Sequence, residues 1–391
     1  MPLKINNSLN IAFSRNPIVI SHRYDEPLDK NGGLLDISIG GSHVFKCRFS
    51  DPLEMDISEI IDAYIPLLPE PDVISAQPVQ QVFSFLKSGK YDVMCHLDYA
   101  SIENEFEFKV LPGGISRQNY RRYAALGTDV FTEKFFESCG NFFMTTRTAE
   151  WRISMKETEL SPLYFIIPRQ DEDIEIKAAT TGQSLYLATH DSGIYTLDLD
   201  ELRRKATIDH QLLPNIFDVY RNETFACRIV IERADIAKER YRLRFRNSLG
   251  VFEIIELTGE LSITPDYSEA EAATFQRFDA VTYSLYSDRE RIERKQSISI
   301  ATGAKRADEV RFLMDMIASE EVYLLDVTPF PLKVIPSAEE LEYRPRPTTP
   351  ENFTLKLEIS DSETNIMQDI IDGTTGCRPR VFTKQFTNQF N

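Results

Sequence analysis

Apolar and polar residues alternate with a period of two along much of the first third of the chain. The clearest example places Phe106, Phe108 and Val110 on one face of a strand, because the residues between them are charged. Similar short apolar runs recur between residues 11 and 110, separated by turn signals such as the glycine pair at 40–41. Short strands at this spacing predict an antiparallel β-sandwich.

Strands with intervening turn residues resume in the segment 151–197. The most distinct hairpin of the chain follows at 241–257, where two apolar runs flank an Asn-Ser-Leu-Gly turn. Alternation along its first strand predicts that Tyr241, Leu243 and Phe245 face the core, and that the three arginines between and after them face solvent. These strands predict a second sandwich.

The segment 115–150 lacks this alternation. A short helix is predicted at 118–126, and the rest is an aromatic-rich connector that we expect to pack between domains. Its phenylalanines are Phe131, Phe135, Phe136, Phe142 and Phe143.

The last third of the chain contains a helical period. Apolar residues at i, i+3, i+4 and i+7 are Val310, Leu313, Met314 and Ile317. This spacing predicts an amphipathic helix over 308–317, with acidic residues in its first turn where the helix dipole favours them. Strands are predicted on both sides of it, including a strictly alternating one at 353–359, so this part is expected to be a small α+β domain.

These patterns predict a mainly β chain with two antiparallel β-sandwich domains of the immunoglobulin-like kind, followed by a small α+β domain with one amphipathic helix. A chain of 391 residues exceeds the usual size of one hydrophobic core, which also favours several domains. The expected domains are 1–114, 115–262 (connector plus second sandwich) and 263–360, with a polar C-terminal tail at 361–391.

Composition supports the β prediction and excludes some partners. The chain has 25 Phe, 16 Tyr and one Trp, an aromatic content that suits pleated strands. The formal charge of −17 repels phosphate backbones, so we expect no nucleic acid partner. The sequence contains no apolar run of about 18 residues and no signal-like start, so we expect no membrane insertion and a cytoplasmic location on synthesis.

Searches for catalytic and metal-binding motifs give no site. The cysteines have no CxxC pair, and the histidines have no HxH or HExxH spacing. The acidic pair Asp198 and Asp200, and the acidic run 171–173, have the spacing that can hold a divalent ion, but they lack the glycine and final glutamate of a calcium loop. No serine-hydrolase elbow, P-loop or dinucleotide fingerprint occurs. We therefore assign no catalytic, cofactor-binding or metal residue and expect no cofactor.

Four segments together resemble a known class of protein. They are the Asn-Pro-Ile-Val at 16–19, the Leu-Pro-Gly-Gly-Ile-Ser at 111–116, the hairpin at 241–259, and the stretch from the helix at 308–317 to the strand at 352–359. In this order they resemble β-rich virion proteins encoded by phages and prophages of gut bacteria, of the tail or tail-tip kind. The resemblance implies a non-enzymatic structural subunit of the virion that packs against copies of itself, as a homo-oligomer, and against other virion proteins.

Two other functions remain open from the sequence. Sandwich loops and exposed tyrosines could bind a glycan or a protein ligand, and a glycan-active enzyme would need two carboxylates across a cleft. The tail at 361–391 combines polar turn formers with Val381, Phe382 and Phe386. This pattern predicts a segment that adds to the sheet edge of a neighbouring copy.

Overall fold

The computed structural model of the chain is mainly β, with 53% strand and 14% helix, as the sequence predicts. Its strands form several open sheets, some mixed and some antiparallel. The residues that the structure describes are 4–5, 11–22, 33–49, 53–65, 82–85, 92–99, 102–125, 142–149, 151–167, 172–189, 193–207, 213–269, 274–289, 292–328, 330–338, 340–345 and 349–360. The predicted tail at 361–391 lies outside them.

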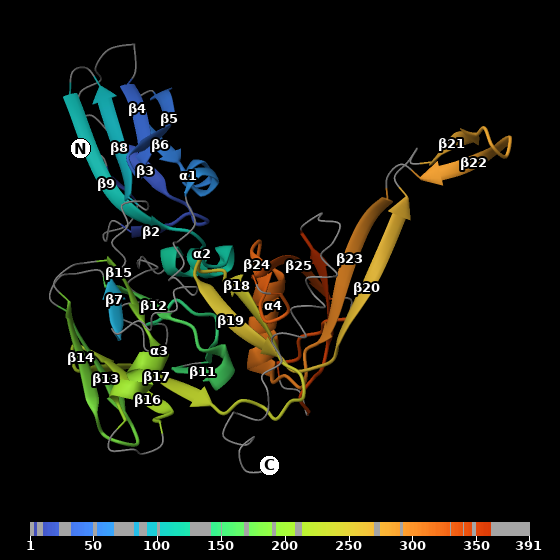
Figure 1. Cartoon of the computed structure of the whole chain (residues 1–391). Coiled ribbons are helices and arrows are strands. Elements are labelled where there is room, and N and C mark those ends of the chain that lie inside the picture. Colours follow the sequence, from blue (N-terminus) through green and yellow to red (C-terminus); the bar gives the residue numbers. More distant parts are fainter. Residues whose placement is uncertain are drawn as a thin grey trace. The chain divides into compact units, whose positions relative to one another are not determined.

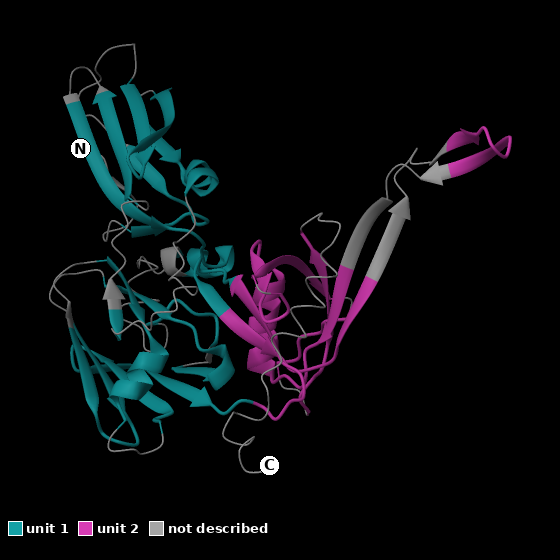
Figure 2. Cartoon of the chain, in the orientation of Figure 1, with its two compact units in different colours: residues 1–234, 246–253 teal, residues 235–245, 254–391 magenta. Residues whose placement is uncertain are grey.

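The chain divides into two compact units (Figure 2). Unit 1 contains residues 1–234 and 246–253, and unit 2 contains residues 235–245 and 254–391. The expected boundaries at 114, 262 and 360 stay predictions.

The N-terminal part of unit 1 has two sheets around one core (Figure 1). The five-stranded sheet has the order β2 (Ile11–Phe13), β9 (Ile102–Leu111), β8 (Asp92–Tyr99), β4 (Gly33–Ile39), β5 (Ser42–Phe49). The three-stranded sheet has the order β1 (Lys4–Ile5), β3 (Val19–His22), β6 (Leu53–Asp56), and helix α1 (Ser58–Tyr64) follows β6. Ile20 of β3, Ile37 of β4 and Ile61 of α1 share the core. The predicted face of β9 is confirmed, since Phe108 and Val110 are buried there.

The rest of unit 1 has two further sheets around a second core. The six-stranded sheet has the order β10 (Thr148–Ala149), β11 (Arg152–Lys156), β17 (Thr224–Glu232), β16 (Ile216–Arg221), β13 (Glu172–Ala178), β14 (Ser184–Thr189). The three-stranded sheet has the order β12 (Leu163–Ile167), β15 (Gly193–Leu197), β7 (Phe83–Phe85). The helices of this part are α2 (Arg117–Ala125), where a short helix is predicted, α3 (Leu199–Lys205) and the 3-10 helix Glu157–Glu159.

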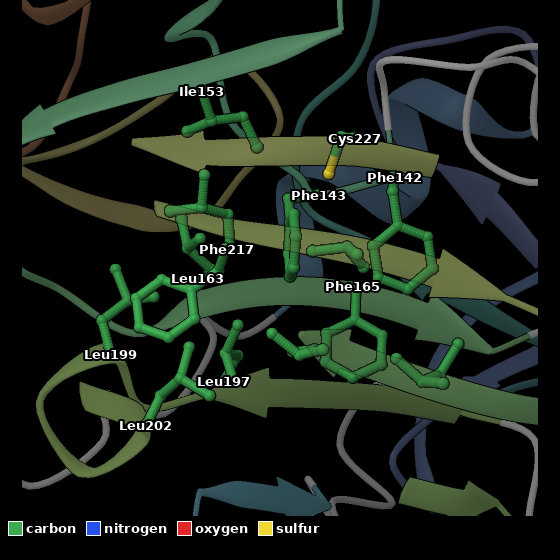
Figure 3. Packing of buried hydrophobic residues seen from close by; sticks show 14 of the residues in the cluster. Phe142, Phe143, Ile153, Leu163, Phe165, Leu197, Leu199, Leu202, Phe217 and Cys227 are labelled. Carbon is green, nitrogen blue, oxygen red and sulfur yellow. The ribbon is translucent and has the colours of Figure 1, made fainter. Parts of the chain in front are cut away.

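Aromatic rings fill the centre of this second core (Figure 3). The ring of Phe165 stacks on Phe142 at 5.1 Å and meets Phe143 edge-on at 5.7 Å between centroids. Two of the five connector phenylalanines therefore serve as core residues. The other three, at positions 131, 135 and 136, lie outside the described residues.

The expectation of purely antiparallel sheets is wrong in two places. β2 pairs with β9 in parallel, and β11 pairs with β17 in parallel, so two sheets of unit 1 are mixed. Alternation along a strand determines which side chains face the core, but it carries no information about the direction of the neighbouring strand. The sequence pattern could therefore predict where the strands lie along the chain, but not which strands pair or in which direction.

Unit 2 is built on one large sheet. Its seven strands have the order β19 (Phe252–Leu257), β18 (Tyr241–Arg246), β24 (Val322–Leu324), β25 (Leu332–Ala338), β26 (Thr354–Ile359), β23 (Ile292–Ala301), β20 (Leu261–Glu269). β21 (Thr274–Asp279) and β22 (Ser284–Arg289) form a separate two-stranded sheet, and α4 (Ala307–Ile317) is the helix among the described residues of this unit. The predicted alternation of β26 is confirmed, because Leu355 and Leu357 are fully buried.

The buried face of helix α4 overlaps the predicted one but is shifted from it, and Ile317 is partly buried against the core as expected. Val310 and Leu313 are buried as expected, but Met314 is 42% exposed, whereas Phe312 and Met316 are buried. The ring of Phe312 packs at 5.0 Å from the ring of Phe245. Since apolar residues occupy two overlapping faces of this helix, the aromatic contact with the sheet selects the face that is buried.

The arginines of β18 do not form a solvent face. Arg242 makes a bidentate ion pair with Asp326, and this hydrogen bonding raises the pKa of the guanidinium. Arg244 is only 7% exposed, and its guanidinium lies 5.1 Å from the centroid of the Tyr323 ring. Alternation predicted the strand correctly, and the Arg242 side chain is 41% exposed, but Arg244 is buried and so needs partners within the protein.

Candidate interaction site

Three of the segments that carry the sequence resemblance meet in unit 1. Asn16 makes a reciprocal pair of hydrogen bonds with the backbone of Ile115: its Nδ2 donates to the carbonyl at 2.9 Å, and its Oδ1 accepts from the N–H at 2.9 Å. The Gly114 N–H donates to the carbonyl of Ser248 at 2.9 Å. We call this meeting of residues 14–16, 111–115 and 247–250 the glycine junction.

Close backbone approach makes the glycine junction specific to glycine. A Cβ atom on Gly250 would lie 1.4 Å from the carbonyl oxygen of Pro112, and one on Gly113 would lie 2.6 Å from the backbone N of Gly250. Both glycines also have positive φ angles, +89° and +116°. Gly113 and Gly250 therefore act as contact points between segments that are distant in the sequence.

A buried polar network extends from the glycine junction. Asn247 donates from Nδ2 to the carbonyl of Met144 at 3.0 Å and to Glu253 Oε2 at 2.7 Å, and Glu253 Oε1 accepts from Thr145 Oγ1 at 2.6 Å. Arg147 then bridges Glu253 at 3.6 Å and Glu159 at 2.7 Å. The residues of this network are buried, so it presents no group to a substrate and fixes the positions of its segments.

The acidic pair singled out in the sequence has a structural role. Asp198 is the N-cap of α3, where its Oδ1 accepts from the N–H of Glu201 at 2.8 Å. Burial, with a contribution from Asp198, raises the pKa of Asp200. Of the run 171–173, residue 171 lies outside the described part. No cluster of three or more His, Cys, Asp or Glu side chains that could hold a metal ion occurs among the described residues.

The histidines and cysteines with described side chains form pairs or are buried. His43 contacts Asp36 at 2.6 Å, and His96 contacts Glu105 at 3.4 Å. Cys95 lies in the N-terminal core and Cys227 in the second core, and burial raises the pKa of the Cys95 thiol to about 12. Cys47 is partly buried. The side chains of His22, His190, His210, Cys139 and Cys377 lie outside the described part.

The main feature that the sequence pattern missed is a long hairpin in unit 2. β20 pairs with β23 over its full length, from 261 to 269, whereas β26 pairs with β23 along 297–301. The residue pairs from 265 onward therefore extend beyond the other strands of the sheet as two strands (Figure 1). Between β20 and β23 in the chain, β21 and β22 pair in a separate two-stranded sheet, whose register differs by two residues from that of β20 and β23. We call β20 and β23 together the long hairpin, and the segment 274–289 its tip.

Polar groups hold the turn of the tip in one conformation. Asp279 accepts from the N–H of Val281 at 2.8 Å and from the hydroxyl of Thr282 at 2.9 Å. The Thr282 hydroxyl is in turn 2.7 Å from the hydroxyl of Tyr286. Tyr283 completes the turn with φ of +51°, a conformation that is uncommon for an aromatic residue.

Large apolar side chains project from this turn. Phe278 lies opposite Leu285 in register, and the ring of Tyr283 packs edge-on at 6.4 Å from the ring of Phe278. These three side chains are 57%, 62% and 84% exposed, and Val281 is 88% exposed. Since isolated surface apolar residues are common but clustered ones mark interaction sites, the tip is the candidate interaction site of unit 2.

A second exposed group lies on the six-stranded sheet of unit 1. The ring of Phe225 lies between Trp151, at 5.9 Å, and Tyr220, at 5.8 Å. Tyr220 is opposite Glu175 in register, and Glu175 accepts a hydrogen bond from the hydroxyl of Tyr186 at 2.9 Å. We call Trp151, Phe225, Tyr220 and Tyr186 the aromatic row; of these, Trp151 is 43% exposed and Tyr186 is 71% exposed.

Comparison with known proteins adds no family. No protein-family model matches the chain, and no curated protein matches it significantly. Within the residues that the structure describes, no helix is both long and apolar enough to cross a membrane. The observations therefore define the chain by its architecture: a two-unit β protein with a long two-stranded hairpin that ends in exposed apolar residues.

Proposed function

We propose that this protein is a non-enzymatic structural subunit of a phage or prophage tail, which packs against copies of itself and against other virion proteins. The observation that carries the proposal is the long hairpin. A two-stranded ribbon is marginally stable in water unless a third strand, a helix or a partner covers it. An assembly would provide that cover at its subunit interfaces.

The architecture of unit 1 supports the same proposal. In each of its two parts a larger sheet and a three-stranded sheet share one core. We infer that these are two sandwich-like, immunoglobulin-like domains, followed by the α+β domain with α4, although two of the sheets are mixed. Multidomain β proteins of this kind present edges and loops as interfaces, and the buried glycine junction would keep such interfaces in fixed positions.

The direct test is whether the chain is part of a particle. Virions from an induced lysate, purified on a density gradient, are digested and the chain is quantified against the major tail protein by mass spectrometry. We expect a fixed ratio that persists through a high-salt wash, together with immunogold labelling on the tail. Absence of the chain from purified particles would overturn the proposal.

The aromatic row favours a second candidate function, binding of a glycan. Aromatic side chains on a sheet face offer apolar surface to sugar rings, and Glu175 and the Asp218–Arg228 ion pair supply hydrogen-bonding groups on the same sheet. Trp151 is the only tryptophan, so its fluorescence reports binding directly. Saturable quenching by a polysaccharide, lost in Tyr220→Ala and kept in Tyr64→Ala of α1, would support this function; no response across a glycan panel would exclude it.

A further inference from the structure

We propose that the tip of the long hairpin docks onto an apolar surface of a second copy of this chain. The inference rests on the proposed function as an assembling subunit, and it names the contact and the partner. The argument uses the strand edges of the long hairpin, the geometry of the tip and its charge.

The edges of the long hairpin are poorly suited to pairing with another strand. β20 is an edge strand of the seven-stranded sheet, and Pro265 within it has no N–H to donate. By sequence, the outer part of β23 is rich in charge, with Glu293, Arg294 and Lys295 in succession. Proline and charge on edge strands are typical protection against edge-to-edge association. Contact with a partner is therefore expected at the tip.

The tip is preorganised for contact. The Asp279 and Thr282 hydrogen bonds fix the turn, and the edge-on packing of Tyr283 on Phe278 fixes two of the exposed rings. Because these side chains are already ordered, docking would lose less conformational entropy than it would for a flexible loop. Tyrosine and phenylalanine are also enriched in the centres of protein interfaces.

The charge of the tip favours a protein partner, and we infer that this partner is a second copy. Two chains that each carry −17 repel one another, so contact between them is favoured where the surface carries little net charge. By sequence the tip has two arginines and two aspartates, which balance. A nucleic acid or an anionic membrane would require a basic excess that the tip lacks. An apolar, neutral projection is thus the part of this acidic chain best suited to self-contact.

A contact of this kind joins different surfaces on the two copies. The projecting tip of one copy meets a receiving surface elsewhere on the next, which is a heterologous contact. Such contacts close into a ring when the rotation between copies permits. The proposal therefore predicts a discrete ring-sized oligomer or a series that grows with concentration.

The first experiment measures self-association of the full chain by sedimentation velocity over a wide concentration range. The double variant Val281→Ser/Leu285→Ser removes two exposed apolar side chains without touching the Asp279 hydrogen bonds. We expect its dissociation constant to rise at least about tenfold, since central apolar contacts dominate interface energies. The matched control is Ile236→Ser, which removes a fully exposed apolar residue of unit 2 outside the long hairpin and should leave association unchanged.

Thermal unfolding of all three proteins checks that the fold is kept, because exposed substitutions have little effect on stability. A wild-type chain that stays monomeric at the highest concentration in solution would overturn the proposal. So would a double variant that associates like the wild type, or an equal loss in the Ile236→Ser control.

A second experiment identifies the partner. A photo-cross-linking phenylalanine analogue replaces Tyr283 in the full chain, and we expect a cross-linked dimer whose second peptide comes from the same chain. Cross-links only to another virion protein would overturn the choice of partner. If the chain is found in virions but the tip variant assembles normally, the tip proposal fails and the proposed function stands. If tip-dependent dimers form but virions lack the chain, the proposed function fails and the tip contact stands.

Discussion

The glycine junction and the tip of the long hairpin use opposite arrangements of polar and apolar groups. In the junction and its network, Asn247, Arg147 and Glu253 are buried, and their hydrogen bonds and ion pairs fix segments that are distant in sequence. In the tip, Asp279 and Thr282 fix an exposed turn, and the apolar side chains face outward.

The difference follows from the cost of burying polar groups in one region and of exposing apolar groups in the other. Buried polar groups are costly unless each finds a partner, so a fully paired buried network specifies a single internal geometry. Exposed apolar side chains leave no polar group without a hydrogen bond, but they provide apolar surface that a partner can remove from water. The comparison thus assigns internal rigidity to one region and external contact to the other, and each assignment can be tested.

The largest expected effect concerns thiols buried in unit 1. Because burial raises the pKa of Cys95 from 9.0 to about 12, its thiolate fraction at neutral pH is about a thousandfold lower than that of an ordinary thiol. Alkylation of the native protein, read by peptide mass spectrometry, should label Cys95 and Cys227 only after unfolding. Cys47, which is partly exposed, is the internal control and should react first. Equal rates at Cys47 and Cys95 would contradict a closed core.

Breaking the glycine junction should have the next largest effect. Gly250→Ala places a methyl group against the Pro112 carbonyl at a positive φ, and we expect a loss of at least about 4 kcal/mol in the free energy of unfolding. Urea unfolding followed by Trp151 fluorescence reports on unit 1. The matched control is Gly41→Ala, where φ is +79° but no atom lies within 4 Å of the added Cβ, so only about 1 kcal/mol should be lost. Equal losses would show that close approach is unimportant.

Removing one charged side chain from the buried network should have the third largest effect. Arg147→Met removes the guanidinium that pairs with the buried carboxylates of Glu159 and Glu253, and breaking a buried ion pair typically costs about 3 kcal/mol or more. Arg152→Met breaks the exposed pair with Glu232 and should cost less than about 1 kcal/mol. Both are read from the same urea curves. A small loss for Arg147→Met would mean that the network is not needed for the stability of unit 1.

These regions also mark how far the sequence could be interpreted. The alternation of β9 and β26 predicted their buried faces, because a strand with one face in a core must repeat every second residue. The segments of the glycine junction stand out in the sequence, but Asn16 and Ile115 are 99 residues apart, and nothing local indicates that they meet. The pairing of Arg242 could not be predicted for the same reason, since its partner Asp326 is 84 residues away.

The tip of the long hairpin was missed because its apolar side chains are not buried in a core. Prediction from alternation needs a core on one side, whereas Phe278 and Leu285 are apolar and exposed. The signal available was the turn chemistry of Asp279 and Thr282 between two runs of aromatic and β-branched residues. Turn-forming residues between two apolar runs that show no alternating buried face could therefore have marked the tip as a hairpin outside the core.

The smallest expected effect tests whether the tip must be preorganised as well as apolar. Asp279→Ala removes the acceptors for Val281 and Thr282 while keeping every exposed apolar side chain, and it should weaken self-association by roughly fivefold. Asp279→Asn keeps an acceptor oxygen and should associate nearly as the wild type does. The fold should melt unchanged in both variants.

The same carboxylate gives the pH dependence of this effect. The backbone N–H of Val281, followed by the Thr282 hydroxyl, lowers the pKa of Asp279 from its ordinary value of 3.8. A group with a lowered pKa contributes above that ordinary value and loses its contribution as the pH falls through the lowered one. The advantage of the wild type over Asp279→Ala should therefore be constant near neutral pH and shrink only below pH 3.8. If Asp279→Ala associates like the wild type at neutral pH, the exposed apolar surface alone accounts for docking and the fixed turn is dispensable.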